Sequence, residues 1–555
     1  MKTVKKYLAI LAAVACAALL PSACHNLDLH YEGGTLDEEQ MQGVLDMNPE
    51  RLNAVVNGMY AILGEPDGYF QRGSSGYAND FGYPAMAMMQ DMNSGDMINI
   101  ESNYDWFTAS YEWSDRTPGY IICYFRFGVP YKVLFAANAV LTDVKALHGD
   151  DAPDSKLKSM RGQALAMRAW AYLSVIPYFQ LKYAGNEDKL ALPLLKDGID
   201  PSNNPRVTLR ELYEENIIPD LTAAIADLEG FVRPSKGNVD QNVAYGLRAR
   251  AYLYMEEWAK AAEDADKAMT GYTPYAISEL TKPGFNNAED HAWIWGLLLP
   301  AEIIGDDARS WPSQLGSFSG EGYTPYAGIY RQINTLLWTK IPTTDVRKKW
   351  WLNESRQSSY LDGLTWGNLS GQAIATGTIP DVKRPMQAYA NVKFGQRAGV
   401  GSSYNDGDWC MMRAEEMMLI KAEATAKAGN LAGGKQILQE FVSIYRNSSF
   451  TSTAASLEAF SNEVWLQRRI ELWGEGFAMA DVMRLGKNVV RYIEGKTPAT
   501  NVPEAYRFNV SSSDPWLLLR FPQSEVNGNR SIIQNTGGVQ PEQNDGKELR
   551  DGVTD

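Results

Sequence analysis

The stretch LRARAYLYMEEWAKAAEDADKA, residues 247–268, decides the fold. Small and apolar side chains recur in it at helical spacing, so they share one face of each of two helices. These positions are Leu247, Ala251, Trp258, Ala261, Ala265 and Ala268. Glu256 and Glu257 mark the turn between the two helices. Because small residues allow helices to approach closely, the stretch is typical of a TPR-like helical pair.

The same offsets recur in IKAEATAKAGNLAGGKQILQEF, residues 420–441, with Gly429 and Asn430 at the turn. Two weaker pairs flank these copies, residues 161–182 with 208–228 and residues 457–472 with 476–492. The sequence therefore predicts a mainly α fold. We expect a scaffold of about four TPR-like helical pairs, with repeats near 155–270 and 409–492 and a few short strands.

Two long insertions interrupt the predicted repeats, near residues 65–118 and 271–408. Both are rich in Tyr, Trp and Phe among Gly, Ser, Asn and Asp. Loops of this length in a compact protein are usually functional or disordered, and abundant aromatics argue against disorder. Within the second insertion, Trp293 and Trp295 alternate in an apolar run that ends at Leu299, which predicts a strand.

The N-terminus has the pattern of a bacterial lipoprotein signal. Lys2, Lys5 and Lys6 precede an apolar run, and small residues lead to Cys24. The run is too short for a comfortable bilayer span, and no later segment offers about 18 continuous apolar residues. We therefore expect acylation of Cys24, for example by palmitate, and an anchored chain. Secretion without acylation is the alternative.

These boundaries predict a signal peptide at residues 1–23, a lipidated tether at 24–40 and a single body at 41–555. Of the remaining cysteines, Cys123 and Cys410 could form a disulfide or stay as two buried thiols.

Composition limits the function. The chain holds 52 Lys and Arg against 67 Asp and Glu, a formal net charge of -15, and its pI is near 5.0. Binding a nucleic-acid polyanion needs clustered basic residues, so we expect no nucleic-acid partner.

Enzyme motifs are missing. The sequence lacks H-E-x-x-H, G-x-S-x-G, a Walker A loop and G-x-G-x-x-G. Of its four histidines, His25 and His30 lie in the tether, which leaves His148 and His291 for imidazole chemistry. The run NDGD at 405–408 lacks the spacing of an EF-hand and is typical of a turn. We expect no catalysis, no cofactor and no metal.

Several separated motifs resemble one family. They are RGQALAMRAWAY at 161–172, Pro193-Leu194, the segment from Arg206 to Ala224, the pattern from Ala414 to Arg446, and the ending Pro522-x-x-Glu525-x3-Asn529-x4-Gln534-Asn535. In order and spacing they resemble the SusD/RagB family of outer-membrane nutrient-binding lipoproteins. The resemblance covers nearly the whole mature chain.

One block departs from the family pattern. The sequence has Gln467-Arg468-x2-Glu471-Leu472-x2-Glu475-Gly476-x-Ala478-x2-Asp481. Gln467 stands where the family has Glu, and Ala478 where it has Arg. We expect the charged residues of this block to form buried ion pairs between helices.

The resemblance implies a lipid-anchored protein exposed at the outer-membrane surface. Such a protein captures oligosaccharides or polysaccharides and delivers them to a SusC-like TonB-dependent transporter. Capture of peptides or glycoproteins on the same scaffold, as in RagB-like members, stays open. A surface glycosidase is a weaker alternative, because carboxylates are plentiful and only their separation in space would identify a catalytic pair.

The loop aromatics are the candidate ligand contacts. Flat aromatic rings pack on the C–H faces of sugars and also hold apolar or cationic peptide groups. The predicted ligand-binding residues are Trp106, Trp113, Trp311, Tyr323, Tyr83 and Trp293. Large aromatics are more often buried in the core than exposed to a ligand. Core packing is therefore the alternative for each of these residues, and it applies most strongly to those in the predicted strand.

Overall fold

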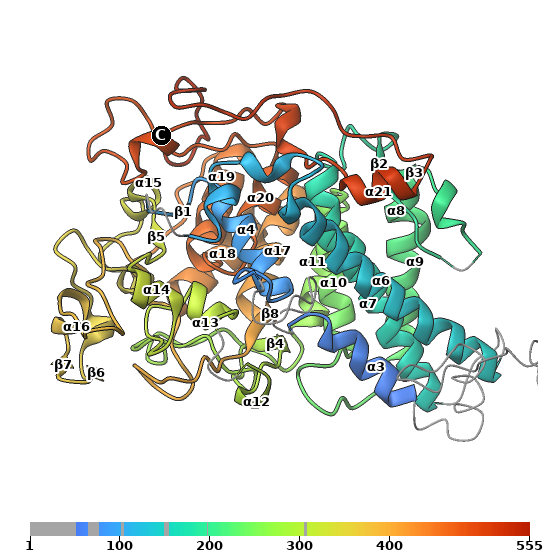
Figure 1. The fold of residues 1–555 in the computed structure, drawn as a ribbon, viewed down its shortest axis with the longest axis horizontal. Helices are drawn as coiled ribbons and strands as arrows, with labels where there is room; N and C mark the ends of the chain where they lie inside the picture. Colours follow the sequence, from blue (N-terminus) through green and yellow to red (C-terminus); the bar gives the residue numbers. More distant parts are fainter. Residues whose placement is uncertain (1–51, 65–76, 101–104, 149–154, 197, 305–307) are drawn as a thin grey trace, which may run out of the picture. The chain divides into compact units, whose positions relative to one another are not determined.

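The computed structural model describes residues 52–64, 77–100, 105–148, 155–196, 198–304 and 308–555 (Figure 1). The described residues belong to one compact unit that runs from Leu52 to Asp555. The predicted signal peptide, Cys24 and the tether lie outside this part of the chain. Among the described residues, no helix has both the length and the apolar character that a membrane span requires.

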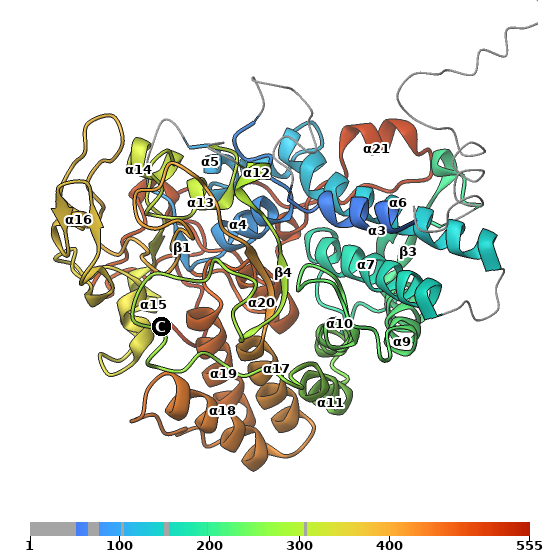
Figure 2. The ribbon, with the colours of Figure 1, turned by 90° about the horizontal axis from the view of Figure 1, so that it is seen from below.

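The first group of helices is α3 (Leu52–Ala61), α6 (Ile121–His148), α7 (Ser155–Phe179), α8 (Leu209–Leu212) and α9 (Ile218–Asp227), with a π-helical turn at Tyr213–Ile217. Helix α7 packs between α6 and α9 (Figures 1 and 2). Two ion pairs join α7 to α9. Arg161 pairs with Asp227 at 2.7 Å, and Arg168 pairs with Asp220 at 2.7 Å. The predicted pair near 161–182 and 208–228 is confirmed.

The second group contains the two repeated stretches. Its helices are α10 (Gln241–Tyr254), α11 (Trp258–Ala268), α17 (Ala414–Lys427), α18 (Leu431–Tyr445) and α19 (Leu457–Glu471). Helix α10 packs on α11, α17 packs on α18, and α11 packs on α17. Glu256 and Gly429 adopt positive φ at the two turns, and the Asn430 side chain accepts a hydrogen bond from the Gly433 N–H at 2.9 Å. The TPR-like arrangement predicted from residues 247–268 and 420–441 is confirmed.

The last predicted helix is shorter than expected. The sequence predicted residues 476–492, whereas α20 covers Ala478–Leu485. Gly486 ends the helix with a φ of +60°, and Val489 then pairs with Val510 through two backbone hydrogen bonds of 2.9 Å. The chain after Leu485 is extended because Val489 finds a backbone partner that is remote in sequence.

A buried ionic cluster connects the helices to the second insertion. Glu471 at the end of α19 pairs with Arg446 and Arg413 at 2.7 Å each. Glu475 pairs with Arg413 at 2.8 Å and with Lys393 at 2.6 Å. Burial alone would raise the pKa of Glu471, yet the surrounding guanidinium groups hold it well below its usual value. The predicted buried ion pairs of this block are confirmed.

The two departures from the family pattern are accommodated locally. The Gln467 side-chain oxygen accepts a hydrogen bond from Arg347 at 2.5 Å, so an amide takes the place of a carboxylate. The Ala478 backbone N–H donates to the Asp91 carboxylate at 3.1 Å. Arg468 keeps its ion pair with Asp481 at 2.7 Å.

The strands are short and form antiparallel pairs. They are β1 (Met97–Ile98) with β5 (Gln332–Ile333), β2 (Leu190–Pro193) with β3 (Arg206–Thr208), β4 (Trp293–Leu297) with β8 (Trp409–Arg413), and β6 (Thr365–Trp366) with β7 (Leu369–Ser370). The strand predicted from the alternating tryptophans is β4, and both Trp293 and Trp295 are buried in it. Cys123 and Cys410 are buried free thiols.

Short helices fill the two insertions and the C-terminal segment. They are α4 (Tyr83–Asn93), α5 (Thr108–Tyr111), α12 (Ala301–Ile304), α13 (Trp311–Gln314), α14 (Tyr323–Ala327), α15 (Thr335–Trp338), α16 (Ala373–Thr376) and α21 (Gln523–Gly528). Figure 2 shows α5, α12, α13 and α14 gathered at one side of the view, away from α9 and α11.

Candidate functional site

The two insertions meet at a small sheet. Met97 of β1 lies opposite Ile333 of β5, although more than 200 residues separate them in sequence. The Asn334 backbone N–H also donates to the Asp96 carbonyl at 2.9 Å. Segments that were predicted as separate insertions therefore form one structure.

Arg331, just before β5, holds this junction together. Its buried guanidinium forms an ion pair with the buried Asp105 carboxylate. It also donates to the Asn99 side-chain oxygen at 2.8 Å and to the Gln314 carbonyl at 3.1 Å. One side chain thus links the residue after β1, the segment before α5, and α13.

Trp106 follows Asp105 directly and lies at the surface, where the residue is 37% exposed. Tyr77 packs edge-on against it, with ring centroids 5.9 Å apart. The Asn79 amide donates to the Trp106 carbonyl at 3.0 Å. Because the neighbouring backbone is fixed on both sides, the exposed indole has a defined position.

Helix α14 places two more aromatic residues beside α13. The Tyr323 backbone N–H donates to the Ser313 hydroxyl at 2.8 Å. Tyr326, on the same short helix, is 58% exposed. Gly328 ends the helix with a φ of +74°, a conformation that favours glycine.

The loop of residues 395–408 adds a fifth aromatic residue, Tyr404, which is 55% exposed. The Gly320 N–H donates to the Ser402 carbonyl at 2.7 Å, and the Ser319 hydroxyl donates to the Asn405 side-chain oxygen. These bonds fix the loop against the segment between α13 and α14. We refer to the exposed Trp106, Tyr326 and Tyr404, together with the partly buried Tyr77 and Tyr323, as the exposed loop aromatics.

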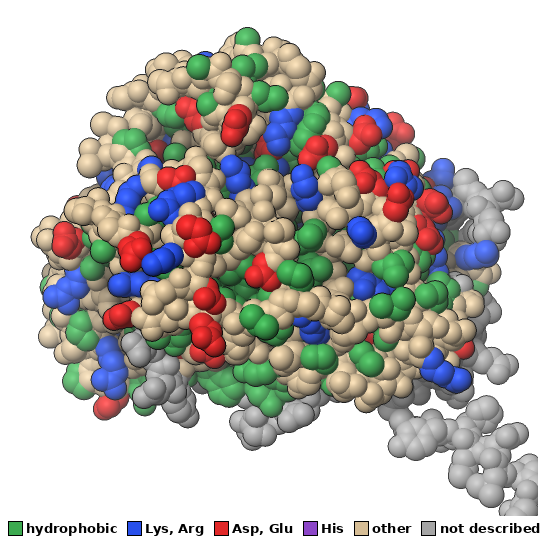
Figure 3. Space-filling model, turned by 90° about the horizontal axis from the view of Figure 1, so that it is seen from above, with side chains coloured by type: hydrophobic (Ala, Val, Ile, Leu, Met, Phe, Trp, Pro, Cys, Tyr) green, Lys and Arg blue, Asp and Glu red, His purple; other side chains and the backbone are tan. Residues whose placement is uncertain are grey.

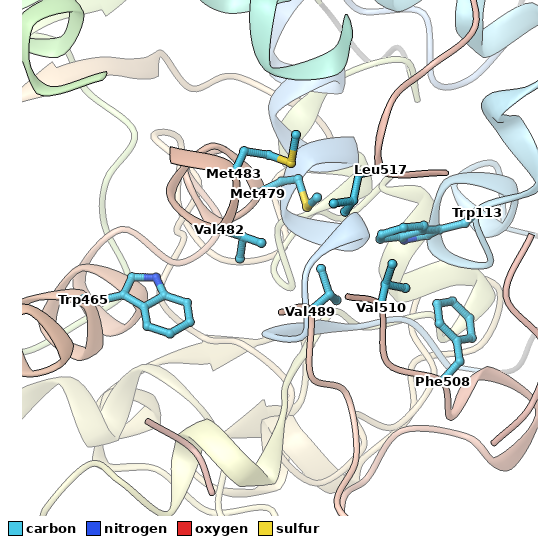
Figure 4. Packing of buried hydrophobic residues seen from close by; sticks show 9 residues of the cluster. All are labelled: Trp113, Trp465, Met479, Val482, Met483, Val489, Phe508, Val510 and Leu517. Carbon is cyan, nitrogen blue, oxygen red and sulfur yellow. The ribbon is translucent and has the colours of Figure 1, made fainter. Parts of the chain in front are cut away.

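Trp113 does not belong to this set, because its ring is fully buried (Figure 4). It packs with Phe508, Val510 and Leu517 in a hydrophobic cluster that also includes residues of α20. Its indole N–H donates to the Asn93 carbonyl at 3.1 Å. The structure assigns Trp113 to packing, where a ligand cannot reach its ring.

Trp293 and Trp311 are also fully buried. The Trp311 indole N–H donates to the Gly407 carbonyl at 2.7 Å, and its ring meets Trp409 edge-on at 5.8 Å. Trp311 therefore fixes the base of the 395–408 loop. Neither ring has an exposed face for stacking on a sugar.

Tyr83 lies on α4 apart from the exposed loop aromatics. It is partly buried, and its ring meets Trp170 edge-on at 5.1 Å. Burial raises the pKa of its hydroxyl to about 12. Of the six predicted contacts, the structure leaves Trp106 exposed and Tyr83 and Tyr323 partly buried.

Tyr326 and Tyr404 were not among the predicted contacts. Both occur in stretches rich in turn-forming residues, YTPYAG at 323–328 and SSYNDG at 402–407. Such surroundings favour surface loops, and this signal could have identified both residues.

The NDGD run was predicted as a turn, but it is irregular backbone that leads into β8, and its side chains are used internally. The Asp408 carboxylate accepts hydrogen bonds from the backbone N–H groups of Ala288 and Leu299 at 2.9 Å each, and it pairs with Arg397 at 2.6 Å. In the part of the chain that the structure describes, no group of three or more His, Cys, Asp or Glu side chains is placed to hold a metal ion.

Two family models match the chain. The one described as "SusD family" matches residues 327–537, and the one described as "Starch-binding associating with outer membrane" matches residues 36–253. The chain belongs to the SusD/RagB family. The repeated stretch at 420–441 falls inside one matched region, whereas the stretch at 247–268 begins inside the other and runs past its end at residue 253. Helices α12 and α13 lie between the two matched regions. No curated protein sequence matches the chain.

Solved structures of SusD-like proteins share this fold. A SusD-like carbohydrate binding protein from Bacteroides vulgatus is 23% identical, with a TM-score of 0.69 over 88% of this chain and 98% of that one. A SusD superfamily protein from Parabacteroides distasonis is 17% identical, with a TM-score of 0.64 over 88% and 99%.

A third solved structure with a similar fold contains a glycan. Surface glycan-binding protein A from Bacteroides thetaiotaomicron, solved in complex with laminarihexaose, is 18% identical, with a TM-score of 0.58 over 88% and 99% of the two chains. At these identities, the three likenesses establish the SusD-like fold.

Proposed function

We propose that this SusD/RagB protein is a non-catalytic, lipid-anchored binding protein that captures oligosaccharides or polysaccharides at the bacterial surface. The observation that carries the proposal is the junction at Arg331, which brings two distant insertions together and holds exposed aromatic rings on fixed backbone. Rings held in place lose little conformational entropy when a ligand packs on them.

The surroundings of the rings suit a neutral polyhydroxylated ligand. Short loops rich in Ser, Asn and Gly lie beside the exposed loop aromatics and supply hydrogen-bonding groups. The upper face of the molecule, which Figure 3 shows, carries basic side chains interspersed with acidic ones. Such a mixture favours neither a nucleic acid nor another polyanion. The relative that was solved with laminarihexaose supports the same ligand class.

The anchor and the partner complete the proposal. Acylation of Cys24 would hold the protein at the outer membrane, in line with the family description that mentions that membrane. A SusC-like TonB-dependent transporter would receive the captured glycan. In the producing bacterium, Cys24→Ala should abolish labelling by a palmitate analogue and release the protein from membranes. Co-purification of the anchored wild-type protein with an outer-membrane barrel tests the partner.

Affinity electrophoresis of the mature chain in gels that contain single polysaccharides tests the ligand. We expect retardation by at least one neutral polysaccharide. Trp106→Ala and Tyr326→Ala should each weaken the interaction about tenfold, because each removes a ring that is exposed for stacking. Phe135→Ala is the matched control, since Phe135 is 70% exposed but lies on α6.

Three results would overturn the proposal. If no polysaccharide of a broad panel retards the protein and a defined peptide pool binds to it, the protein is assigned to peptide capture. Equal retardation of the Trp106→Ala variant and the wild type would place the glycan elsewhere. Turnover of the bound glycan that one carboxylate substitution abolishes would show a glycosidase.

A further inference from the structure

A cavity of about 510 Å³ lies between residues 275–290 and 395–400. None of the exposed loop aromatics lines it. Pockets that bind small molecules usually have volumes of roughly 300–1,000 Å³, so the cavity has room for one or two sugar units.

The cavity wall is held in place before any ligand arrives. Gly284 exchanges hydrogen bonds with the neighbouring segment, donating to the Lys393 carbonyl at 3.0 Å and accepting from the Gly395 N–H at 2.9 Å. A Cβ atom on Gly395 would lie 2.8 Å from the Pro283 carbonyl oxygen, so this close approach requires glycine. The Tyr275 hydroxyl donates to the Asp290 carboxylate at 2.6 Å.

Several polar groups of the lining have unused hydrogen-bonding capacity. Within the described part of the chain, no hydrogen bond or ion pair involves the side chains of Lys282 and Asn286. The Arg397 guanidinium pairs with Asp408 through one nitrogen, at 2.6 Å, and is one-third exposed. These groups offer both donors and an acceptor to a molecule in the cavity.

The charges of the lining select a neutral ligand. Glu279 and Asp290 bring two carboxylates, and Lys282 and Arg397 bring two cations. A ligand with one sign of charge would meet a like charge as well as an opposite one, which reduces its net attraction. Sugar hydroxyls both donate and accept, so they can use carboxylate, amide and guanidinium groups together.

Apolar side chains complete the lining. Leu280, Phe285, Leu364 and Val400 contribute apolar surface, on which the C–H groups of a sugar ring can pack. We propose that this cavity is a second carbohydrate subsite, which holds one or two neutral sugar units apart from the exposed loop aromatics.

The loop of residues 395–408 connects the cavity with the exposed loop aromatics. Gln396 lines the cavity, whereas Ser402 and Tyr404 lie on the side that contacts the segment between α13 and α14. A branched or folded glycan held by the exposed loop aromatics could place one branch in the cavity. This role rests on the proposed function, but the occupancy of the cavity can be tested separately.

Saturation-transfer NMR on the full mature chain tests the occupancy. The probes are glucose, galactose, mannose and N-acetylglucosamine, with trialanine as the peptide probe. We expect at least one sugar to give a saturation-transfer signal, and we expect trialanine not to reduce that signal. Asn286→Ala and Lys282→Ala should each weaken that sugar about three- to tenfold, because each removes a side chain that makes no internal hydrogen bond.

Phe135→Ala is the matched control, because Phe135 is exposed on α6 and does not line the cavity, and it should leave the monosaccharide signal unchanged. Circular dichroism of each variant checks that the fold is kept. The subsite is refuted if no sugar gives a signal, if neither cavity variant weakens it, or if trialanine binds in place of sugars. Failure of the proposed site at the exposed loop aromatics gives a different result. Polysaccharide retardation would then be absent or would not change in Trp106→Ala, while the monosaccharide signal would persist.

Discussion

Replacing Arg331 by Met should both destabilise the protein and disturb its binding site. Met keeps most of the aliphatic volume but removes the guanidinium, which leaves the Asp105 carboxylate buried without its cation. Among the described residues, the Phe107 backbone N–H, 3.0 Å from that carboxylate, is then its remaining hydrogen-bond donor. Breaking a buried pair by removing one partner costs about 3–5 kcal/mol.

A double-mutant cycle isolates the pair itself. Urea denaturation of the wild type, Arg331→Met, Asp105→Leu and the double variant gives four free energies of unfolding. We expect the double variant to be more stable than Arg331→Met alone, because no buried charge is left unpaired. Calorimetry should also show weaker glycan binding by Arg331→Met. The ion pair holds Asp105 in place, and its loss should displace the neighbouring Trp106 ring. A loss below about 1 kcal/mol in Arg331→Met, or strictly additive single losses, would refute this reasoning.

Two further predictions concern stability. Burial raises the pKa of Asp91 to about 7, above its unfolded value of about 4, so the free energy of unfolding that this carboxyl contributes is lost as pH rises between those values. In urea denaturation between pH 5 and pH 8, Asp91→Asn should therefore lose less stability than the wild type, and parallel profiles would contradict this. Gly434→Ala should cost about 1–3 kcal/mol in thermal unfolding, because its Cβ would lie 2.6 Å from a methyl group of α17. Gly58→Ala, with nothing within 4 Å of the added Cβ, is the control, and an equal loss in both variants would be the contrary result.

The sequence predicted the parts of the fold that depend on local spacing. The repeated offsets at 247–268 and 420–441 determine which faces of α10, α11, α17 and α18 are buried, and this pattern needs no knowledge of remote contacts. Helix α6 was missed, because Gly128 and Pro130 interrupt its pattern although the helix continues through them. The end of α20 was missed because Val489 pairs with the remote Val510.

The binding residues were harder to predict than the helices. Trp106 and Trp113 lie seven residues apart in similar loops, yet one is exposed and the other is fully buried. Burial of Trp113 depends on Phe508 and Leu517, which are 395 and 404 residues away in sequence. The residue types identified the two insertions, whereas the tertiary contacts decided which rings reach the surface.

The most direct test of the central claim is a crystal structure of the mature chain with an oligosaccharide derived from the polysaccharide that retards it best. The account predicts a sugar ring packed on Trp106 or Tyr326, with neighbouring hydroxyls bonded to the loops around Arg331. A saccharide that binds elsewhere and contacts neither Trp106 nor Tyr326 would contradict the account.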